Sequence, residues 1–370
     1  MKKVAIITRH SVANYGSILQ SYATQKAFEN LGFECFIINY SKEEEKGLNL
    51  AKTLCYNSKK WSKNLFTRIV YSIIQTPNYF VAYKKFEKFR AHLLNQTIEY
   101  TSFEDLKSNP PIADIYCTGS DQVWGKIGRD KIDKTYFLEF VPENSKCISY
   151  AASIGTSSIS QEMVKYFQKY LKKYGKILVR EKSAVDILEK IGFKNTEMVL
   201  DPTLLLDCNQ WENLTTIKPS NKKYILVYQL HDNKKMEIYC KRMSKILGLK
   251  LIRICPSFQS LFRTGNGVLL PTPSEFLSYI KNAEYIITDS FHGTVFSIIF
   301  NKEFVDIMPK DTSTRIENLL ELFDLKNRIL KNYEDFSIFD KKINYDYVNE
   351  KLVAERTKSI EKLLKAIAGK

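Results

Sequence analysis

The sequence lacks the patterns that mark several common classes of protein. Its seven cysteines are an odd number, are scattered over 370 residues and form no C-x-x-C pair. This argues against a disulfide framework and against a structural zinc site, so we expect buried free thiols. No apolar run approaches the roughly 18 residues that a membrane-spanning helix needs. The apolar stretch near the start, VAII, is too short for a secretion signal, so we expect a cytoplasmic protein.

Common nucleotide-binding and catalytic motifs are absent as well. The sequence has no G-x-G-x-x-G, no G-x-x-x-x-G-K and no G-x-S-x-G, and its four histidines form no metal-ligand spacing. These absences disfavour dinucleotide chemistry and nucleoside-triphosphate chemistry. We expect no metal and no bound cofactor.

The charge is strongly basic, with a formal net value of +15. Lysines are spread over the whole length and no nucleic-acid motif accompanies them, so we expect no nucleic-acid partner. A basic surface suits phosphorylated substrates and peripheral association with anionic lipid at the inner face of the cell membrane.

Strand and helix patterns alternate in two successive runs. Residues 4–8, 17–32 and 34–40 read as strand, helix and strand, which predicts parallel pairing. The alternation resumes after a polar break at 217–223, from a strand at 224–230 onward. We therefore predict an α/β fold with two Rossmann-like, doubly wound domains, at residues 1–205 and 206–340. A final helix at 341–370 either packs back on the N-terminal domain or mediates a dimer.

Residues 42–100 interrupt the first domain with lysine-rich, aromatic helical sequence that we expect to break at Pro77. Two interpretations are open for this insertion. Its helices either pack amphipathically on the core or form a hairpin that faces a membrane, and we favour packing.

Ligands of doubly wound sheets bind at the carboxyl ends of the strands, so turns after predicted strands are the candidate sites. We expect both domains to aim these edges at a shared cleft. The first turn contains Asn14, Tyr15 and Gly16, where a helix start offers backbone N–H groups. In the second turn, Asp121, Gln122 and Trp124 follow a strand. Trp124 suits stacking on a sugar, unless Asp121 caps a helix and Trp124 packs in the core.

Two further turns contain an arginine and a histidine. Arg180 ends a strand and either forms a surface ion pair with Glu181 or presents its guanidinium to an anion. His292 and Gly293 follow Ser290 in DSFHGT, between a strand and a helix. Three roles are open for His292: it donates a hydrogen bond to a phosphate, acts as a general acid, or is satisfied by a backbone carbonyl.

Six fragments taken in order resemble the polysaccharide pyruvyl transferase family. They are NYGSILQSYATQKAFENLGF, GSDQVW, KCISYAASIGT, LVREKSAVDILEKIGF, VLDPTLLL and ITDSFHGTVFSIIFNKEFV. The resemblance spans residues 4 to about 310. The resemblance implies a fold similar to glycosyltransferase type B, with the active site in the interdomain cleft. It also implies transfer of the enolpyruvyl group of phosphoenolpyruvate to a sugar, forming a cyclic pyruvate ketal and releasing phosphate. Family members modify cell-wall or capsular polysaccharide, often while it is lipid-linked.

The resemblance also implies roles for individual residues. His292 corresponds to the family's histidine near the donor, as phosphate ligand or acid, and Arg180 to the arginine that holds the donor's anionic end. Ser290 and Gly293 complete the donor side. Some members have an arginine where this chain has Ser290, and the missing charge would come from Arg9, Arg253 or Lys310. On the acceptor side, which the first domain would supply, Asp121 is the candidate base, and Asn14, Tyr15, Gly16, Gln122 and Trp124 surround it.

Two other functions fit the same pattern. A type B glycosyltransferase with a nucleotide-sugar donor would share the fold and the basic surface. A non-catalytic binding subunit of a polysaccharide-assembly complex would explain the missing arginine at position 290.

Overall fold

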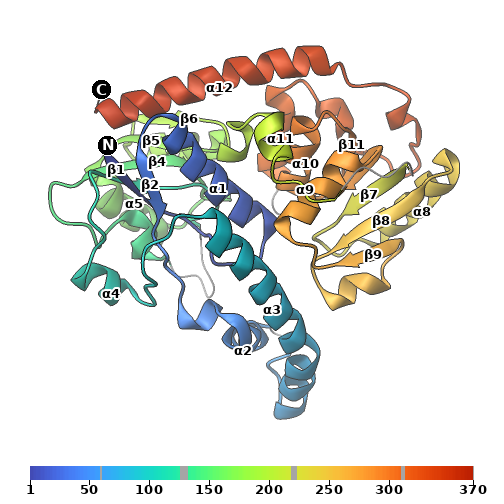
Figure 1. The fold of residues 1–370 in the computed structure, drawn as a ribbon, viewed down its shortest axis with the longest axis horizontal. Coiled ribbons are helices and arrows are strands. Elements are labelled where there is room, and N and C mark those ends of the chain that lie inside the picture. The colour runs from blue at the N-terminus through green and yellow to red at the C-terminus, as the bar shows by residue number, and fades with distance from the viewer. Residues whose placement is uncertain (59–60, 126–131, 218–222, 310–312, 370) are drawn as a thin grey trace. The chain divides into compact units, whose positions relative to one another are not determined.

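A computed structural model describes residues 1–58, 61–125, 132–217, 223–309 and 313–369. The chain divides into two compact units, one of Met1–Leu205 with Arg356–Lys370 and one of Leu206–Glu355. Each unit is built on its own parallel sheet (Figure 1). The predicted class, α/β with two Rossmann-like sheets, is confirmed.

The first unit has a six-stranded sheet in the order β2-β1-β3-β4-β5-β6. Every neighbouring pair is parallel, as the strand–helix–strand pattern predicted. The strands are β1 (Lys3–Ile7), β2 (Glu34–Ile37), β3 (Ile115–Thr118), β4 (Lys146–Ala152), β5 (Tyr174–Val179) and β6 (Thr196–Met198). The helices before the second unit are α1 (Tyr15–Asn30), α2 (Gly47–Asn57), α3 (Leu65–Leu93), α4 (Phe103–Ser108), α5 (Gln161–Tyr170) and α6 (Lys182–Lys190).

The strand order of this sheet locates its ligand-binding position. The chain moves from β1 to β2 on one side and then crosses back to β3 on the other side of β1. Because parallel crossovers are right-handed, this reversal sends the connecting segments to opposite faces. Ligands of such sheets bind where the reversal occurs, at the carboxyl ends of the two strands concerned. In the first unit these strands are β1 and β3.

The second unit has a five-stranded parallel sheet in the order β11-β10-β7-β8-β9. Its reversal lies between β7 and β10, because the chain runs from β7 to β8 and β9 and then returns to the other side of β7. The strands are β7 (Tyr224–Tyr228), β8 (Lys250–Cys255), β9 (Asn266–Leu269), β10 (Tyr285–Thr288) and β11 (Glu303–Asp306). The helices are α7 (Cys208–Glu212), α8 (Lys234–Leu247), α9 (Pro273–Asn282), α10 (Phe291–Ile299) and α11 (Ser313–Leu322).

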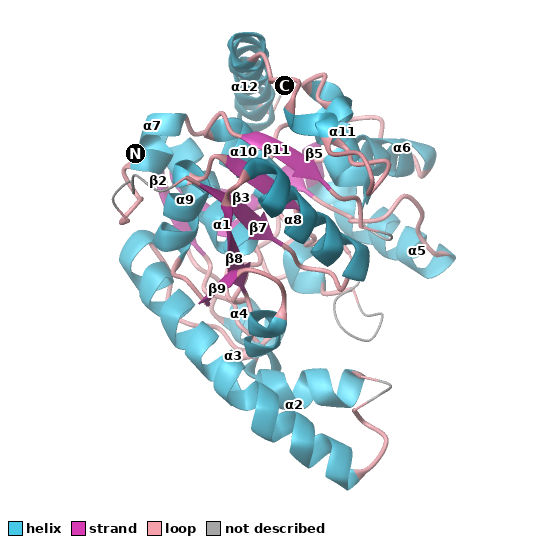
Figure 2. Cartoon of the chain, turned by 90° about the vertical axis from the view of Figure 1, so that its right-hand side faces the viewer, coloured by secondary structure: helices cyan, strands magenta, loops and turns pink. Residues whose placement is uncertain are grey.

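The insertion in the first unit forms a helical hairpin in which α2 packs against α3 (Figure 2). The expected break at Pro77 is wrong, because α3 runs unbroken from Leu65 to Leu93. Proline removes one backbone N–H from a helix and crowds the preceding turn, so it normally kinks or ends the helix. Here α3 is held on both sides of the proline, by a capping box of Asn64 and Thr67 at its start and by Arg90, which donates to the Ser11 carbonyl (3.0 Å), near its end.

The last helix, α12 (Tyr345–Ala368), contributes to each unit. In the first unit, the Leu200 N–H donates to Ser359 Oγ (3.0 Å) and Lys362 donates to the Met198 carbonyl (2.9 Å). In the second unit, Tyr347 and Lys351 both donate to Asp324. All seven cysteines are free thiols and six are buried, as expected. Within the described ranges, no helix is long and apolar enough to cross a membrane.

Candidate functional site

In the first unit, the carboxyl ends of β1 and β3 bring two predicted residues together. Asn14 caps α1, and its side-chain oxygen accepts from the Ser17 N–H (3.2 Å). The Ser17 hydroxyl in turn donates to Asp121 Oδ2 (2.5 Å). Asn14 and Asp121 therefore share a partner, Ser17, which the sequence analysis did not single out.

Asp121 has an unusual backbone conformation. Its φ is +75°, a left-handed value that costs energy for any residue with a Cβ. A parallel bridge to Ala152 holds the backbone there, and Asp121 Oδ1 accepts from the Gln122 N–H (2.8 Å). The half-buried carboxylate is thus fixed at the sheet edge rather than at a helix start. Such strain is concentrated at functional sites, which favours a chemical role for Asp121.

Arg9 adds positive charge to the same edge. Burial lowers the pKa of Arg9, but the nearby Tyr136, Glu45 and Asp121 outweigh it, so the pKa lies above the usual arginine value. Its guanidinium lies 3.9 Å from Glu45. Arg9 is therefore held as a cation close to Asp121.

Two predicted acceptor residues lie in the core instead. The Trp124 side chain is 0% exposed, stacks on Phe137 and donates to the Tyr136 carbonyl (3.1 Å). Tyr15 is 2% exposed and packs against Phe86. The packing alternative therefore holds for Trp124 and its predicted stacking on a sugar is wrong, while burial leaves little of the Tyr15 side chain accessible to an acceptor. Asn14 is exposed, Gln122 is half-buried and Gly16 is buried in the first turn of α1.

Arg180 lies at the carboxyl end of β5 in a buried ion cluster. Its guanidinium donates to Asp201 Oδ2 (2.8 Å) and lies 3.8 Å from Glu181, and its side chain is 2% exposed. Ser120 donates to the same Asp201 oxygen (3.2 Å). Glu181 accepts from Ser153 (2.8 Å) and from two backbone N–H groups. The cluster therefore joins the ends of β3, β4 and β5.

In the second unit, Ser290 caps α10 at the carboxyl end of β10, accepting from the Gly293 N–H (3.4 Å). His292 lies in the first turn of α10 and is 9% exposed. A Cβ at Gly293 would lie 2.3 Å from Thr288 Oγ1, so only glycine lets α10 start this close to β10. The geometry brings Ser290, His292 and Gly293 together at the sheet reversal.

A second histidine lies at the same reversal and was missed by the sequence analysis. His231, just after β7, shares a hydrogen bond with Asp289 through Nδ1 (3.1 Å). Asp289 also accepts from the Leu230 and His231 N–H groups (2.7 and 2.9 Å). The Asp289 side chain is 3% exposed, whereas that of His231 is 49% exposed. An imidazole oriented by a buried carboxylate is suited to proton transfer. The sequence signal that could have identified His231 is its position directly after the strand predicted at 224–230.

Arg253 and Lys310 are two of the three residues predicted to supply the charge missing at position 290. Arg253 is 1% exposed and donates to Thr264, Gln229 and Glu237, so it stabilises the second unit and is wrong as a replacement charge. Lys310 lies outside the described residues. Arg315 on α11, not predicted, places its guanidinium 5.8 Å from the Phe291 ring, and the His292 ring lies 5.1 Å from the same ring.

Asp306, at the end of β11, is a buried carboxyl behind the first turn of α10. It accepts from the Thr294 hydroxyl (2.7 Å) and is 0% exposed. Burial, opposed by that hydrogen bond and reinforced by Asp289, raises the pKa of Asp306 to about 8. Asp306 is therefore mostly protonated and neutral at pH 7.

We expect Asp306→Asn to remove a pH dependence of stability. The folded pKa lies above the unfolded value, so the native chain keeps a proton that the unfolded chain releases. The wild type should lose stability relative to the variant as pH rises from about 4 to about 8, by up to about 1.4 kcal/mol per pH unit. Urea unfolding of both proteins at pH 6 and 7.5 measures this. Equal pH dependence in both proteins would contradict it.

A sequence profile of polysaccharide pyruvyl transferases matches residues 14–309. The chain belongs to the polysaccharide pyruvyl transferase family. The matched region of this pyruvyl transferase family member starts at the cap of α1, directly after β1, and ends after β11, so it includes β2 to β11 and the reversal between β7 and β10. None of the curated protein sequences compared with the chain is significantly similar to it.

Solved structures show the fold of this pyruvyl transferase family member. The Anabaena protein HepE, solved with UDP and glucose, is 7% identical over 100% of both chains, with a TM-score of 0.51. An α-glucosyltransferase solved with UDP and a 13-mer DNA is 10% identical over 98% of this chain and 93% of that one, with a TM-score of 0.52. At these identities the likeness establishes the glycosyltransferase type B fold alone. The described residues contain no group of three or more His, Cys, Asp or Glu that could hold a metal ion.

Proposed function

We propose that the protein transfers the pyruvyl group of phosphoenolpyruvate to two hydroxyls of a sugar in a cell-surface polysaccharide, forming a cyclic ketal and releasing phosphate. The family match over residues 14–309 is the observation that supports this proposal most strongly. The acceptor is a sugar or oligosaccharide, and we propose that it is lipid-linked and modified at the inner face of the membrane.

The reaction needs an acid, a base and anion-binding groups. Protonation of the donor's methylene carbon gives a methyl group and an oxocarbenium-like centre at C2. One sugar hydroxyl adds to C2 and loses its proton, and a second hydroxyl then displaces phosphate, losing its own proton as the ring closes. A positioned acid and base each contribute about 100- to 10,000-fold to such steps.

The second unit offers the groups that the donor requires. The start of α10 presents backbone N–H groups at a carboxyl sheet edge, an arrangement that favours phosphate. We assign His292 the role of phosphate ligand or acid at the donor. Ser290 and Gly293 would set the backbone shape of the turn that holds it. We propose that Arg315 replaces the arginine absent at position 290, because its guanidinium lies over the Phe291 ring, next to His292.

The first unit offers a carboxylate for the acceptor. Asp121 is fixed by its backbone bridge and by Ser17, and it remains half-buried. We assign it as the base that receives a hydroxyl proton, with Asn14, Gly16 and Gln122 around it. Arg9, whose pKa is raised in part by Asp121, places a positive charge near this carboxylate.

Donor binding and phosphate release test this proposal. We expect phosphoenolpyruvate, and not UDP-glucose or UDP-N-acetylglucosamine, to raise the unfolding temperature, since a ligand at 100 times its Kd stabilises by about 2.7 kcal/mol. Phosphate release should require a sugar acceptor. Mass spectrometry of glycans from cells with and without the gene should show one pyruvate ketal only when the gene is present.

The same three measurements distinguish the proposed function from a nucleotide-sugar glycosyltransferase and from a non-catalytic binding subunit. Stabilisation by the nucleotide sugars alone would indicate a glycosyltransferase and overturn the proposed donor. Unchanged glycans, with no phosphate release from phosphoenolpyruvate across the acceptors, would indicate a binding subunit.

A further inference from the structure

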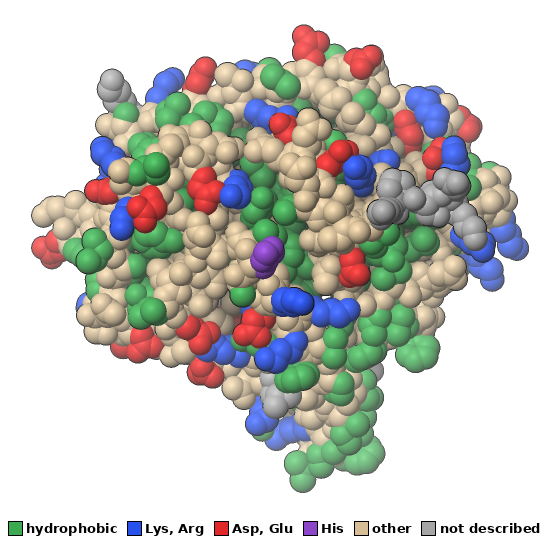
Figure 3. All heavy atoms as spheres, in the orientation of Figure 1, with side chains coloured by type: hydrophobic (Ala, Val, Ile, Leu, Met, Phe, Trp, Pro, Cys, Tyr) green, Lys and Arg blue, Asp and Glu red, His purple; other side chains and the backbone are tan. Residues whose placement is uncertain are grey.

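The α2–α3 hairpin exposes an apolar patch made of Leu65, Phe66, Ile69, Ile73 and Phe80. These side chains are 72%, 74%, 49%, 69% and 46% exposed. At about 100° per residue they fall within about 100° of one another around α3, so they form one stripe. In Figure 3, hydrophobic side chains gather at the lower tip, where Figure 1 draws this hairpin. An apolar stripe on a protruding element marks an interaction surface.

The same hairpin is strongly basic. Residues 47–93 contain nine lysines or arginines and one acidic residue, Glu87, so this segment carries about half of the chain's net charge of +15. Lys84 and Lys88 are exposed and continue the helical face of the stripe toward the end of α3. The hairpin therefore combines an exposed apolar stripe with basic residues along its length.

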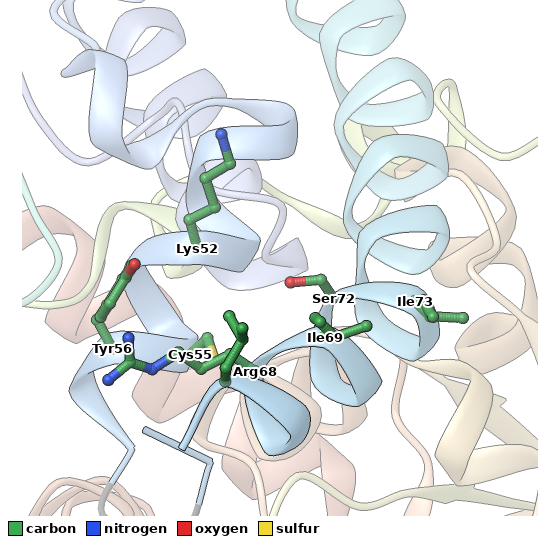
Figure 4. Close-up of a pocket in the computed structure, with 8 residues that line it drawn as sticks. Lys52, Cys55, Tyr56, Arg68, Ile69, Ser72 and Ile73 are labelled. Atoms are coloured by element: carbon green, nitrogen blue, oxygen red, sulfur yellow. The ribbon is translucent and has the colours of Figure 1, made fainter. Parts of the chain in front are cut away.

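A cavity of about 320 Å³ opens between the two helices beside the patch (Figure 4). Leu65, Ile69 and Ile73 of the stripe line it together with Cys55 of α2. Arg68, also in the lining, packs its guanidinium over the Tyr56 ring at 5.0 Å. The apolar surface thus continues into the space between α2 and α3.

We propose that this hairpin docks the protein on an anionic lipid bilayer. The stripe would enter the interface between headgroups and acyl chains, while the lysines contact anionic headgroups. The proposal rests on the proposed function only for its purpose, which is to bring the enzyme to a lipid-linked acceptor.

Charge argues for lipid rather than for a second copy of the chain. Two copies meeting through this face would bring two strongly basic hairpins together, each with a single acidic residue to offset the repulsion. An anionic bilayer instead attracts every exposed lysine of the hairpin.

Vesicle binding of the full chain, measured without phosphoenolpyruvate or acceptor, tests the docking separately from the chemistry. We expect co-sedimentation with vesicles of phosphatidylcholine and phosphatidylglycerol, and about tenfold weaker binding to phosphatidylcholine alone. Phe66→Asp with Ile73→Asp should weaken binding to the anionic vesicles about tenfold. Lys84→Glu with Lys88→Glu should weaken it to a similar extent.

The matched control is Ile112→Asp, which changes an 88% exposed isoleucine outside the hairpin and should leave binding unchanged. All the substituted side chains are exposed, so unfolding temperatures should match the wild type. Absence of binding by the wild type, or equal loss in the control, would overturn the proposal. A concentration-dependent dimer broken by the Phe66 and Ile73 substitutions, without vesicle binding, would assign the patch to a second copy and overturn it too.

Discussion

Replacing His292 with alanine should lower kcat for phosphate release from phosphoenolpyruvate by about 100- to 10,000-fold, the range for loss of a positioned acid. His292 lies in the first turn of α10 at the reversal between β7 and β10, where donor phosphate and backbone N–H groups would meet. Steady-state kinetics with a saturating acceptor measure the change. His292→Gln keeps a hydrogen-bond donor but cannot transfer a proton, so it separates phosphate binding from acid catalysis.

The His231–Asp289 pair provides the comparison for this experiment. In His231→Gln, Asp289 keeps its bonds to two backbone N–H groups, so the turn should remain folded. If His292 is the acid, its glutamine variant loses kcat while the His231 variant retains most of it. The reverse result would assign the acid to His231 and leave His292 as a phosphate ligand. Full activity in both variants would contradict a donor site at this sheet edge.

The framework of both sheets could be predicted because its elements have strong local signals. β1, α1 and β2 alternate with clear periodicity, and α1 begins at the predicted turn with Asn14 as its cap. The turn from β10 to α10 was identified in the same way. These connections place Asn14, Asp121 and His292 at sheet reversals, so the location of candidate chemistry followed from the topology alone.

Other features depend on tertiary contacts that a local pattern does not contain. β9 and β11 lie at opposite edges of their sheet, and their sequences, NGVL and EFVD, lack the continuous apolar run that identified the equally short β10. Trp124 follows a strand, as ligand-binding residues of such sheets do, but its ring stacks on Phe137 in the core. His231 is a candidate for proton transfer because Asp289 orients its ring, and Asp289 is 58 residues away in the sequence.

Asp201→Ala should destabilise the first unit by about 3–5 kcal/mol, the cost of leaving one partner of a buried ion pair behind. Asp201 is 2% exposed, and its Oδ2 accepts from Arg180 and Ser120 while its Oδ1 accepts from Thr203. Without it, the Arg180 guanidinium still has the Glu181 carboxylate at 3.8 Å but loses the shorter contact at 2.8 Å. Denaturant unfolding of the full chain measures the loss. An unchanged midpoint would mean that Arg180 finds compensation elsewhere.

Removing both charges distinguishes a structural Arg180 from a donor ligand. Arg180→Met with Asp201→Leu should recover most of the stability lost in Asp201→Ala, because apolar pairs of similar volume often replace buried ion pairs without loss. If Arg180 only joins the ends of β3, β4 and β5, this double variant should keep its KM for phosphoenolpyruvate. A stable double variant with a KM raised about tenfold or more would instead assign Arg180 to the donor's anionic end, since a charged hydrogen bond contributes about 1.5–3 kcal/mol. The surface ion pair that the sequence left open for Arg180 is wrong, because its side chain is 2% exposed. Stability and KM thus report separately on a buried structural role and on donor binding.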